Sequence, residues 1–259
     1  MPFVRHLIRG TDFRRFIDFV TPAFFEVMPA GGLAKTATRL VRDYSSREAF
    51  EGAIEHRRGT LRGQVDLEVR GAEKAPGQYP AGSDLRGANE DARRAVGQAT
   101  LQLYFHQLFD AEGPTLLDLS LDRFSWNGER AVWTPGRGHF DWPPTFREAL
   151  VDVYRAFYTE GGGTLVEALK PLHLEPAADV FGEHFGGGDQ RAVRFEVSKF
   201  IESFHAVFMC CKAHGVRLDP AFLGLGIYLA TMYETLETVG LPLDVRGAFE
   251  AVHGRRAAA

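Results

Sequence analysis

The chain has 259 residues, of which 45% are hydrophobic and 25% charged, and its formal net charge is −4. This composition is typical of an ordered globular protein and excludes a chain that is disordered throughout. Acidic residues outnumber basic ones by 34 to 30. The sequence therefore offers no strongly basic patch for the phosphates of nucleic acid, and we exclude nucleic acid as a partner.

Phenylalanine is frequent, with 21 residues, and it is crowded near the start of the chain. Phe13, Phe16 and Phe24 follow an apolar pattern at helical spacing, which Pro22 is expected to kink. Phenylalanine has no polar group, so it belongs in a core, an interface or an apolar pocket. We expect this first helix to contact something beyond the core, and we take Phe13, Phe16 and Phe24 as candidate binding residues.

Residues 1–88 are predicted to form an N-terminal helical segment with a short strand and a loop. Ser45 and Glu48 have the spacing of a capping box, which predicts a helix start. Apolar and polar residues alternate over 64–70, as in a half-buried strand. Residues 71–88 contain repeated Gly and Pro without periodicity, which favours a loop or a domain boundary.

Residues 89–259 are predicted to form a helical domain with a small β-hairpin, either separate from the first segment or continuous with it. Asn89 begins a long helical pattern, and Asn127-Gly128 between β-prone arms is typical of a two-residue hairpin turn. A helix of about 25 residues is expected from Asp189. The predicted fold class is therefore mainly α (α+β).

The two cysteines and the hydropathy pattern indicate a cytoplasmic protein. Cys210 and Cys211 are adjacent in a predicted helix, so their side chains diverge and a disulfide between them is unfavourable. The N-terminus carries no signal-peptide pattern. The longest uncharged run, residues 220–233, is too short to cross a bilayer. We predict no transmembrane segment, although peripheral contact with a membrane is compatible with the sequence.

A metal site is the alternative reading of three residues. Glu202 and His205 form a Glu-x-x-His pair on a predicted helix, a motif that supplies two metal ligands in some helical bundles, and His106 is a further candidate ligand. Helical phase opposes this reading, because it places His205 on the flank of the apolar face and Glu202 nearly opposite that face.

Two carboxylates precede the predicted hairpin. Asp118 and Asp122 are four residues apart, and a carboxylate pair beside a hairpin can hold Mg²⁺ in kinase-like sites. The alternative is that both side chains simply cap turns. No phosphate-binding loop, dinucleotide-binding glycine motif or nucleophile elbow is present.

The order of helix, hairpin, glycine-containing loop and further helices resembles the C-terminal lobe of the UbiB (AarF) family of atypical protein-kinase-like proteins. The similar segments are residues 144–150, 165–169, 214–223 and 241–244. The resemblance implies a kinase-like lobe in which Asp118, Asp122 and Thr134 converge on one cleft. It also implies lost catalysis, because Thr134-Pro135-Gly136 stands where that family carries the metal-binding Asp-Phe-Gly.

These observations favour a non-catalytic, pseudokinase-like binding or scaffold protein over an enzyme. Its expected partner is a protein, a lipid or a small apolar ligand, and no cofactor is expected. The alternative is a helical enzyme or ligand-binding protein with an aromatic pocket, dependent on a divalent metal held by His106, Glu202 and His205. The sequence does not define an oligomeric state.

Overall fold

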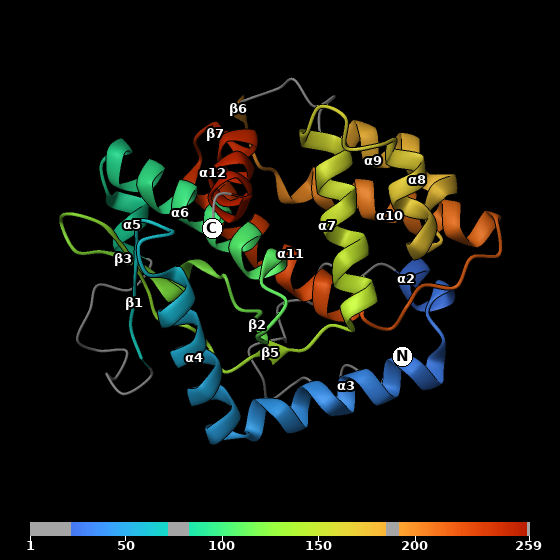
Figure 1. Ribbon diagram of the computed structural model, residues 1–259, viewed down its shortest axis with the longest axis horizontal. Coiled ribbons are helices and arrows are strands. Elements are labelled where there is room, and N and C mark those ends of the chain that lie inside the picture. Colours follow the sequence, from blue (N-terminus) through green and yellow to red (C-terminus); the bar gives the residue numbers. More distant parts are fainter. Residues whose placement is uncertain (1–21, 72–82, 185–191, 258–259) are drawn as a thin grey trace.

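The computed structural model describes residues 22–71, 83–184 and 192–257, so Phe13 and Phe16 lie outside the described residues. Helices dominate, and the mainly α fold class is confirmed (Figure 1). In chain order the described α-helices are α2 (Pro22–Val27), α3 (Ala30–Ser45), α4 (Arg47–Leu61), α5 (Ser83–Gly87), α6 (Glu90–Phe109), α7 (Pro144–Tyr158), α8 (Leu165–Leu169), α9 (Ala178–His184), α10 (Val197–Ala213), α11 (Phe222–Val239) and α12 (Val245–Ala257).

Short strands and 3₁₀ turns connect the helices. The strands are β1 (Leu67–Val69), β2 (Thr115–Leu116), β3 (Phe124–Trp126), β4 (Ala131–Trp133), β5 (His139–Phe140), β6 (Ala192–Val193) and β7 (Leu243–Asp244), and the 3₁₀ turns are η2 (Leu121–Arg123), η3 (Lys170–Leu172) and η4 (Glu175–Ala177). β4 lies between β1, which is parallel to it, and β3, which is antiparallel. β2 pairs with β5, and β6 pairs with β7.

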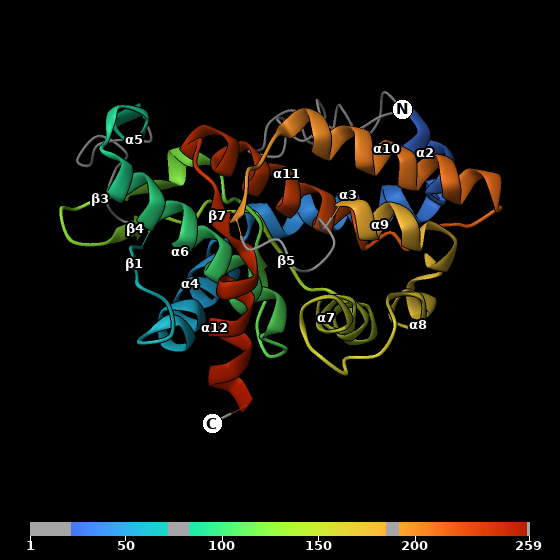
Figure 2. The same ribbon diagram turned by 90° about the horizontal axis from the view of Figure 1, so that it is seen from above.

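Helix α11 is the most buried long helix of the fold. Its sequence is apolar on all sides, and nearly every residue from Phe222 to Leu236 is buried. Such a helix is stable only when other elements surround it. It packs against α3, α6 and α10, and α6 packs in turn against α7 and α12. Figures 1 and 2 place β1, β3 and β4 at one end of the molecule and α8, α9 and α10 at the other.

The predicted hairpin is present, but its turn differs from the prediction. The Asn127 N–H donates to the Arg130 carbonyl, so the central residues of the turn are Gly128 and Glu129. Gly128 adopts a φ of 102°, whereas Asn127 has no positive φ. The Asn127 side-chain oxygen instead accepts from the N–H groups of Glu129 and Arg130. This side-chain bonding stabilises the turn and moves it by one residue.

Two predicted helix starts are wrong. Ser46, and not Ser45, caps α4, because its side chain accepts from the Ala49 N–H at 3.3 Å. Helix α10 begins at Val197, well after Asp189, because Ala192 and Val193 form strand β6. By contrast, the Asn89 cap of α6 is confirmed by a 2.9 Å bond from the Ala92 N–H. The predicted strand over 64–70 shortens to β1.

The core is one contiguous hydrophobic cluster that extends from Ala23 to Val252. It contains residues from both sides of the predicted boundary at 71–88, among them Leu33 from α3 and Leu103 from α6. Within the described part of the chain, no helix combines the length and apolar character needed to cross a membrane.

Candidate functional site

Asp118 lies in a closed cluster just before the hairpin. It is 5% exposed, and its carboxylate accepts from the Ser120 N–H at 3.1 Å and the Ser120 hydroxyl at 2.6 Å. The Arg123 guanidinium donates to its other oxygen at 2.5 Å. A Cβ built on Gly136 would lie only 2.5 Å from the same oxygen. Ser120, Arg123 and Gly136 thus enclose the Asp118 carboxylate, and we call these four residues the Asp118 cluster.

Asp122 and Thr134 only partly follow the predicted convergence. Thr134 adjoins the Asp118 cluster, because its N–H donates to the Arg123 carbonyl at 2.8 Å. Asp122, in η2, is exposed. The two predicted carboxylates therefore do not share one site, because Asp118 is buried whereas Asp122, in η2, is exposed.

Phe24, a predicted binding residue, lies in the core of the structure. Its side chain is 3% exposed and packs edge-on against Phe208 of α10, with ring centroids 5.3 Å apart. Helix α2 is covered by α10, so this part of the phenylalanine-rich stretch belongs to the core. The apolar pattern was correct, but it carries no information on which distant helix covers it.

His106, Glu202 and His205 do not form a ligand group. His106 is buried on α6, whereas Glu202 and His205 are exposed on α10, in agreement with the helical phase. Among the described residues, no group of three or more His, Cys, Asp or Glu side chains could hold a metal ion.

A second charged cluster, which the sequence reasoning missed, links α4 to the end of α6. Arg57 is fully buried and donates to Asp110 at 2.5 Å, and His56 lies 2.7 Å from the same carboxylate oxygen. The Arg57 guanidinium also donates to the carbonyl oxygens of Gly113 and Pro114. Burial opposes ionisation of Asp110, but Arg57 and His56 outweigh it and lower the pKa of that carboxyl below 3.8. We call His56, Arg57 and Asp110 the Asp110 cluster.

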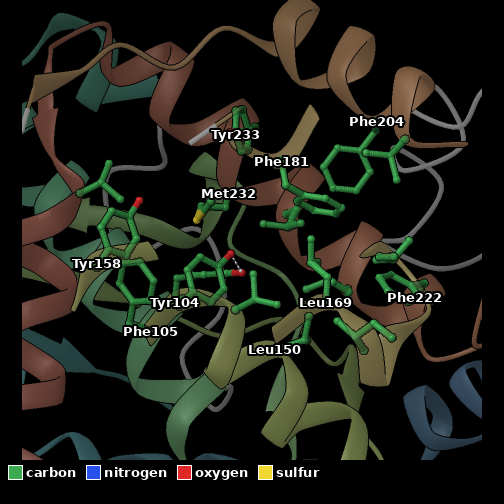
Figure 3. Close-up of a pocket in the computed structure, with 18 of the residues that line it drawn as sticks. Tyr104, Phe105, Leu150, Tyr158, Leu169, Phe181, Phe204, Phe222, Met232 and Tyr233 are labelled. Atoms are coloured by element: carbon green, nitrogen blue, oxygen red, sulfur yellow. Dashed lines mark hydrogen bonds between the residues drawn. The ribbon is translucent and has the colours of Figure 1, made fainter. Parts of the chain in front are cut away.

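An aromatic cavity lies between α6, α7, α10 and α11, with further walls from α8, α9 and the adjoining turns (Figure 3). The centre of a water-sized sphere can move through about 90 Å³ of it, several times the space that one water molecule needs. The described side chains that line it are apolar or aromatic, and none carries a charge. Pockets of this kind, with few polar groups, are typical binding sites for small apolar molecules.

Tyrosines gather on one side of the aromatic cavity. Figure 3 shows Tyr104, Tyr158 and Tyr233 on the side away from Phe222 and Leu169. The hydroxyls of Tyr104 and Tyr154 lie 2.6 Å apart and form a hydrogen bond. The two sides of the cavity therefore differ in chemistry, one having phenol groups and the other only hydrocarbon.

Burial raises the pKa values of the cavity tyrosines above that of an exposed phenol. Burial, reinforced by Tyr154, raises the pKa of Tyr104 well above 10, and burial raises the pKa of Tyr154 to about 12. Burial also raises the pKa values of Tyr158 and Tyr233. The hydroxyls thus remain protonated at neutral pH and can donate hydrogen bonds.

No protein-family model matches the chain, and no curated protein matches it significantly. The structure combines a neutral aromatic cavity with two ion-paired carboxylates, Asp118 and Asp110.

Proposed function

We propose that this chain is a non-catalytic binding protein that takes a small apolar ligand in the aromatic cavity. The observation that carries the proposal is a space enclosed by four long helices and lined without a single charged side chain among the described residues. Removal of apolar ligand surface from water, at roughly 25 cal/mol per Å², is the driving force that such a site offers.

The Asp118 cluster supports the non-catalytic part of this proposal. Phosphoryl transfer needs a free carboxylate and Mg²⁺ ligands at the nucleotide. Here the Asp118 carboxylate is ion-paired with Arg123, and Gly136 packs against both groups. In the kinase-like interpretation, this places an internal cation where a metal would be needed. We therefore extend the proposal to a degenerate, pseudokinase-like lobe that binds without catalysing.

The test is binding of the neutral fluorophore N-phenyl-1-naphthylamine, whose emission rises in an apolar site. Leu169 is fully buried and lines the cavity, whereas Val166 of the same helix is 46% exposed and is not among the lining residues. Leu169→Trp fills cavity space, and Val166→Trp is its matched control. We expect saturable binding to the wild type and to Val166→Trp, and at least tenfold weaker binding to Leu169→Trp.

Circular dichroism establishes that each variant folds. If Leu169→Trp does not fold, Val153→Phe, which narrows the cavity from α7, takes its place. Absence of saturable fluorescence with the folded wild type contradicts the proposal, as does equal affinity in the cavity-filling variant and its control.

A further inference from the structure

The tyrosine side of the aromatic cavity narrows the class of ligand. From its geometry we infer that the ligand is an uncharged apolar alcohol, whose hydroxyl meets the Tyr104 and Tyr154 pair while its hydrocarbon body extends toward Phe222 and Leu169. This inference rests on the proposed function and assigns the ligand class and its orientation.

The Tyr104 hydroxyl can bond a ligand as well as Tyr154. A phenol hydroxyl has one donor and two acceptor positions. The bond between Tyr104 and Tyr154 uses one of these positions on the Tyr104 oxygen, and either oxygen can be its donor. When Tyr154 donates, the Tyr104 proton is available to a ligand, and when Tyr104 donates, its oxygen still accepts. A ligand hydroxyl matches both arrangements because it donates as well as accepts.

The described cavity wall carries no charged side chain. A carboxylate or phosphate head that leaves water needs a cation or several strong donors, since its burial is otherwise costly. The lining contains Leu, Val, Phe, Met and Tyr side chains, and no Lys, Arg or His. The chain holds its buried guanidinium groups elsewhere, as Arg57 shows. We therefore expect the cavity to bind a fatty alcohol more tightly than the fatty acid anion of the same chain length.

Polarity changes along the cavity, from the tyrosine hydroxyls on one side to hydrocarbon on the other. Tyr104 contacts the Tyr154 ring, with centroids 6.0 Å apart, and the Tyr154 and Tyr158 rings are parallel within 6°. These rings form one wall from α6 and α7. Figure 3 shows Phe222 and Leu169 on the opposite side. A ligand with a single polar end fits this gradient in one orientation.

The experiment uses three matched competitors of the bound fluorophore, octan-1-ol, n-nonane and octanoate, at pH 8. In n-nonane a methyl group replaces the hydroxyl of the alcohol. We expect octan-1-ol to compete at concentrations at least tenfold lower than octanoate. Tyr104→Phe removes one hydroxyl and keeps the ring. It should lower the affinity for octan-1-ol about fivefold and leave the affinity for n-nonane unchanged. Tyr154→Phe tests the other oxygen independently, and both variants are checked for folding.

Tyr44→Phe, on α3, is the matched control because Tyr44 does not line the cavity. It should leave the competition by all three compounds unchanged. Equal competition by octanoate and octan-1-ol overturns the inference, as does an unchanged octan-1-ol affinity in both folded Tyr→Phe variants, although the cavity remains a binding site in either case. If the fluorophore itself does not bind the wild type, the proposed function fails as well, so the two failures are distinguishable.

Discussion

The aromatic cavity and the Asp118 cluster differ in how their polar groups are satisfied. In the Asp118 cluster, both oxygens of a buried carboxylate are bonded to neighbours from the same short segment, and no space remains beside Gly136. In the cavity, the Tyr104 and Tyr154 hydroxyls pair at the wall of an open volume. Asp118, a candidate site residue in the sequence, is therefore bonded internally, whereas the proposed ligand site lies among neutral rings.

Alkaline titration acts on the tyrosine-rich region and gives the largest expected effect. Burial raises the pKa values of five of the seven tyrosines, Tyr104, Tyr154, Tyr158, Tyr228 and Tyr233. Groups with a raised folded pKa contribute stability below the unfolded value of about 10 and lose it as pH rises, about 1.4 kcal/mol per pH unit for each. We expect cooperative unfolding between pH 10 and 12.

Absorbance at 295 nm and circular dichroism measure this transition together. The five buried tyrosines should ionise only as the helical signal is lost. Ionisation of all seven tyrosines near pH 10 in a chain that keeps its helical signal contradicts the burial of these five side chains.

Removal of the Arg57 side chain acts on the charged region. Arg57→Ala leaves the Asp110 carboxylate without its buried cation, and breaking a buried pair in this way costs about 3 kcal/mol. The neighbouring Arg58 is partly exposed and pairs weakly with Glu55, at 3.5 Å, so Arg58→Ala should cost less than about 1 kcal/mol. Urea unfolding measures both values, and equal losses would show that the Asp110 cluster contributes no special stability.

Gly136→Ala tests whether the Asp118 cluster is closed. The added methyl group meets Asp118 and Arg123 side-chain atoms at 2.5 to 3.1 Å, and overpacking of this kind costs about 1 to 3 kcal/mol. Gly52 lies inside α4 with open space around its Cβ position, so Gly52→Ala should stabilise the chain by about 0.5 to 1 kcal/mol. If both substitutions stabilise, room exists beside Asp118 and the cluster is open.

Acid titration has the smallest expected effect. The pKa of Asp110 is lowered in the folded chain, because Arg57 and His56 outweigh the opposing effect of burial. Its contribution is present above the ordinary pKa of 3.8 and is lost as pH falls through the folded value. Asp110→Asn should therefore flatten the loss of stability below pH 4, measured by urea unfolding at several pH values. If the free energy of unfolding of Asp110→Asn falls with pH as steeply as that of the wild type, Asp110 does not contribute to the acid sensitivity.

Local rules predicted much of the helical framework. The Asn89 cap of α6 depends on a side-chain to backbone bond over three residues, and this bond is present. Local errors moved a boundary by one residue, as at the Ser46 cap of α4 and the hairpin turn. The larger error, at the start of α10, arose where pairing is nonlocal, because Ala192 and Val193 pair with β7 as strand β6.

The candidate site was much less predictable. The aromatic cavity is assembled from side chains between Leu101 and Val245 that are distant in sequence and meet only after the helices pack. Helical spacing predicts which residues of a helix are apolar and buried, but it carries no information on whether their neighbours fill the space between helices. Arg123, the partner of Asp118, lies only five residues away in the sequence. The ion pair between them could therefore have been predicted by looking for a basic residue close to Asp118.

Thermal unfolding of one folded sample with two alternative additives compares the two regions directly. Octan-1-ol should raise the melting temperature in a saturable manner, because a ligand that binds only the native state stabilises it. ATP with Mg²⁺ should leave the melting temperature unchanged, because the Asp118 carboxylate is already ion-paired with Arg123. Saturable, Mg²⁺-dependent stabilisation by ATP, with no stabilisation by octan-1-ol, would contradict the account and transfer the functional site to the hairpin.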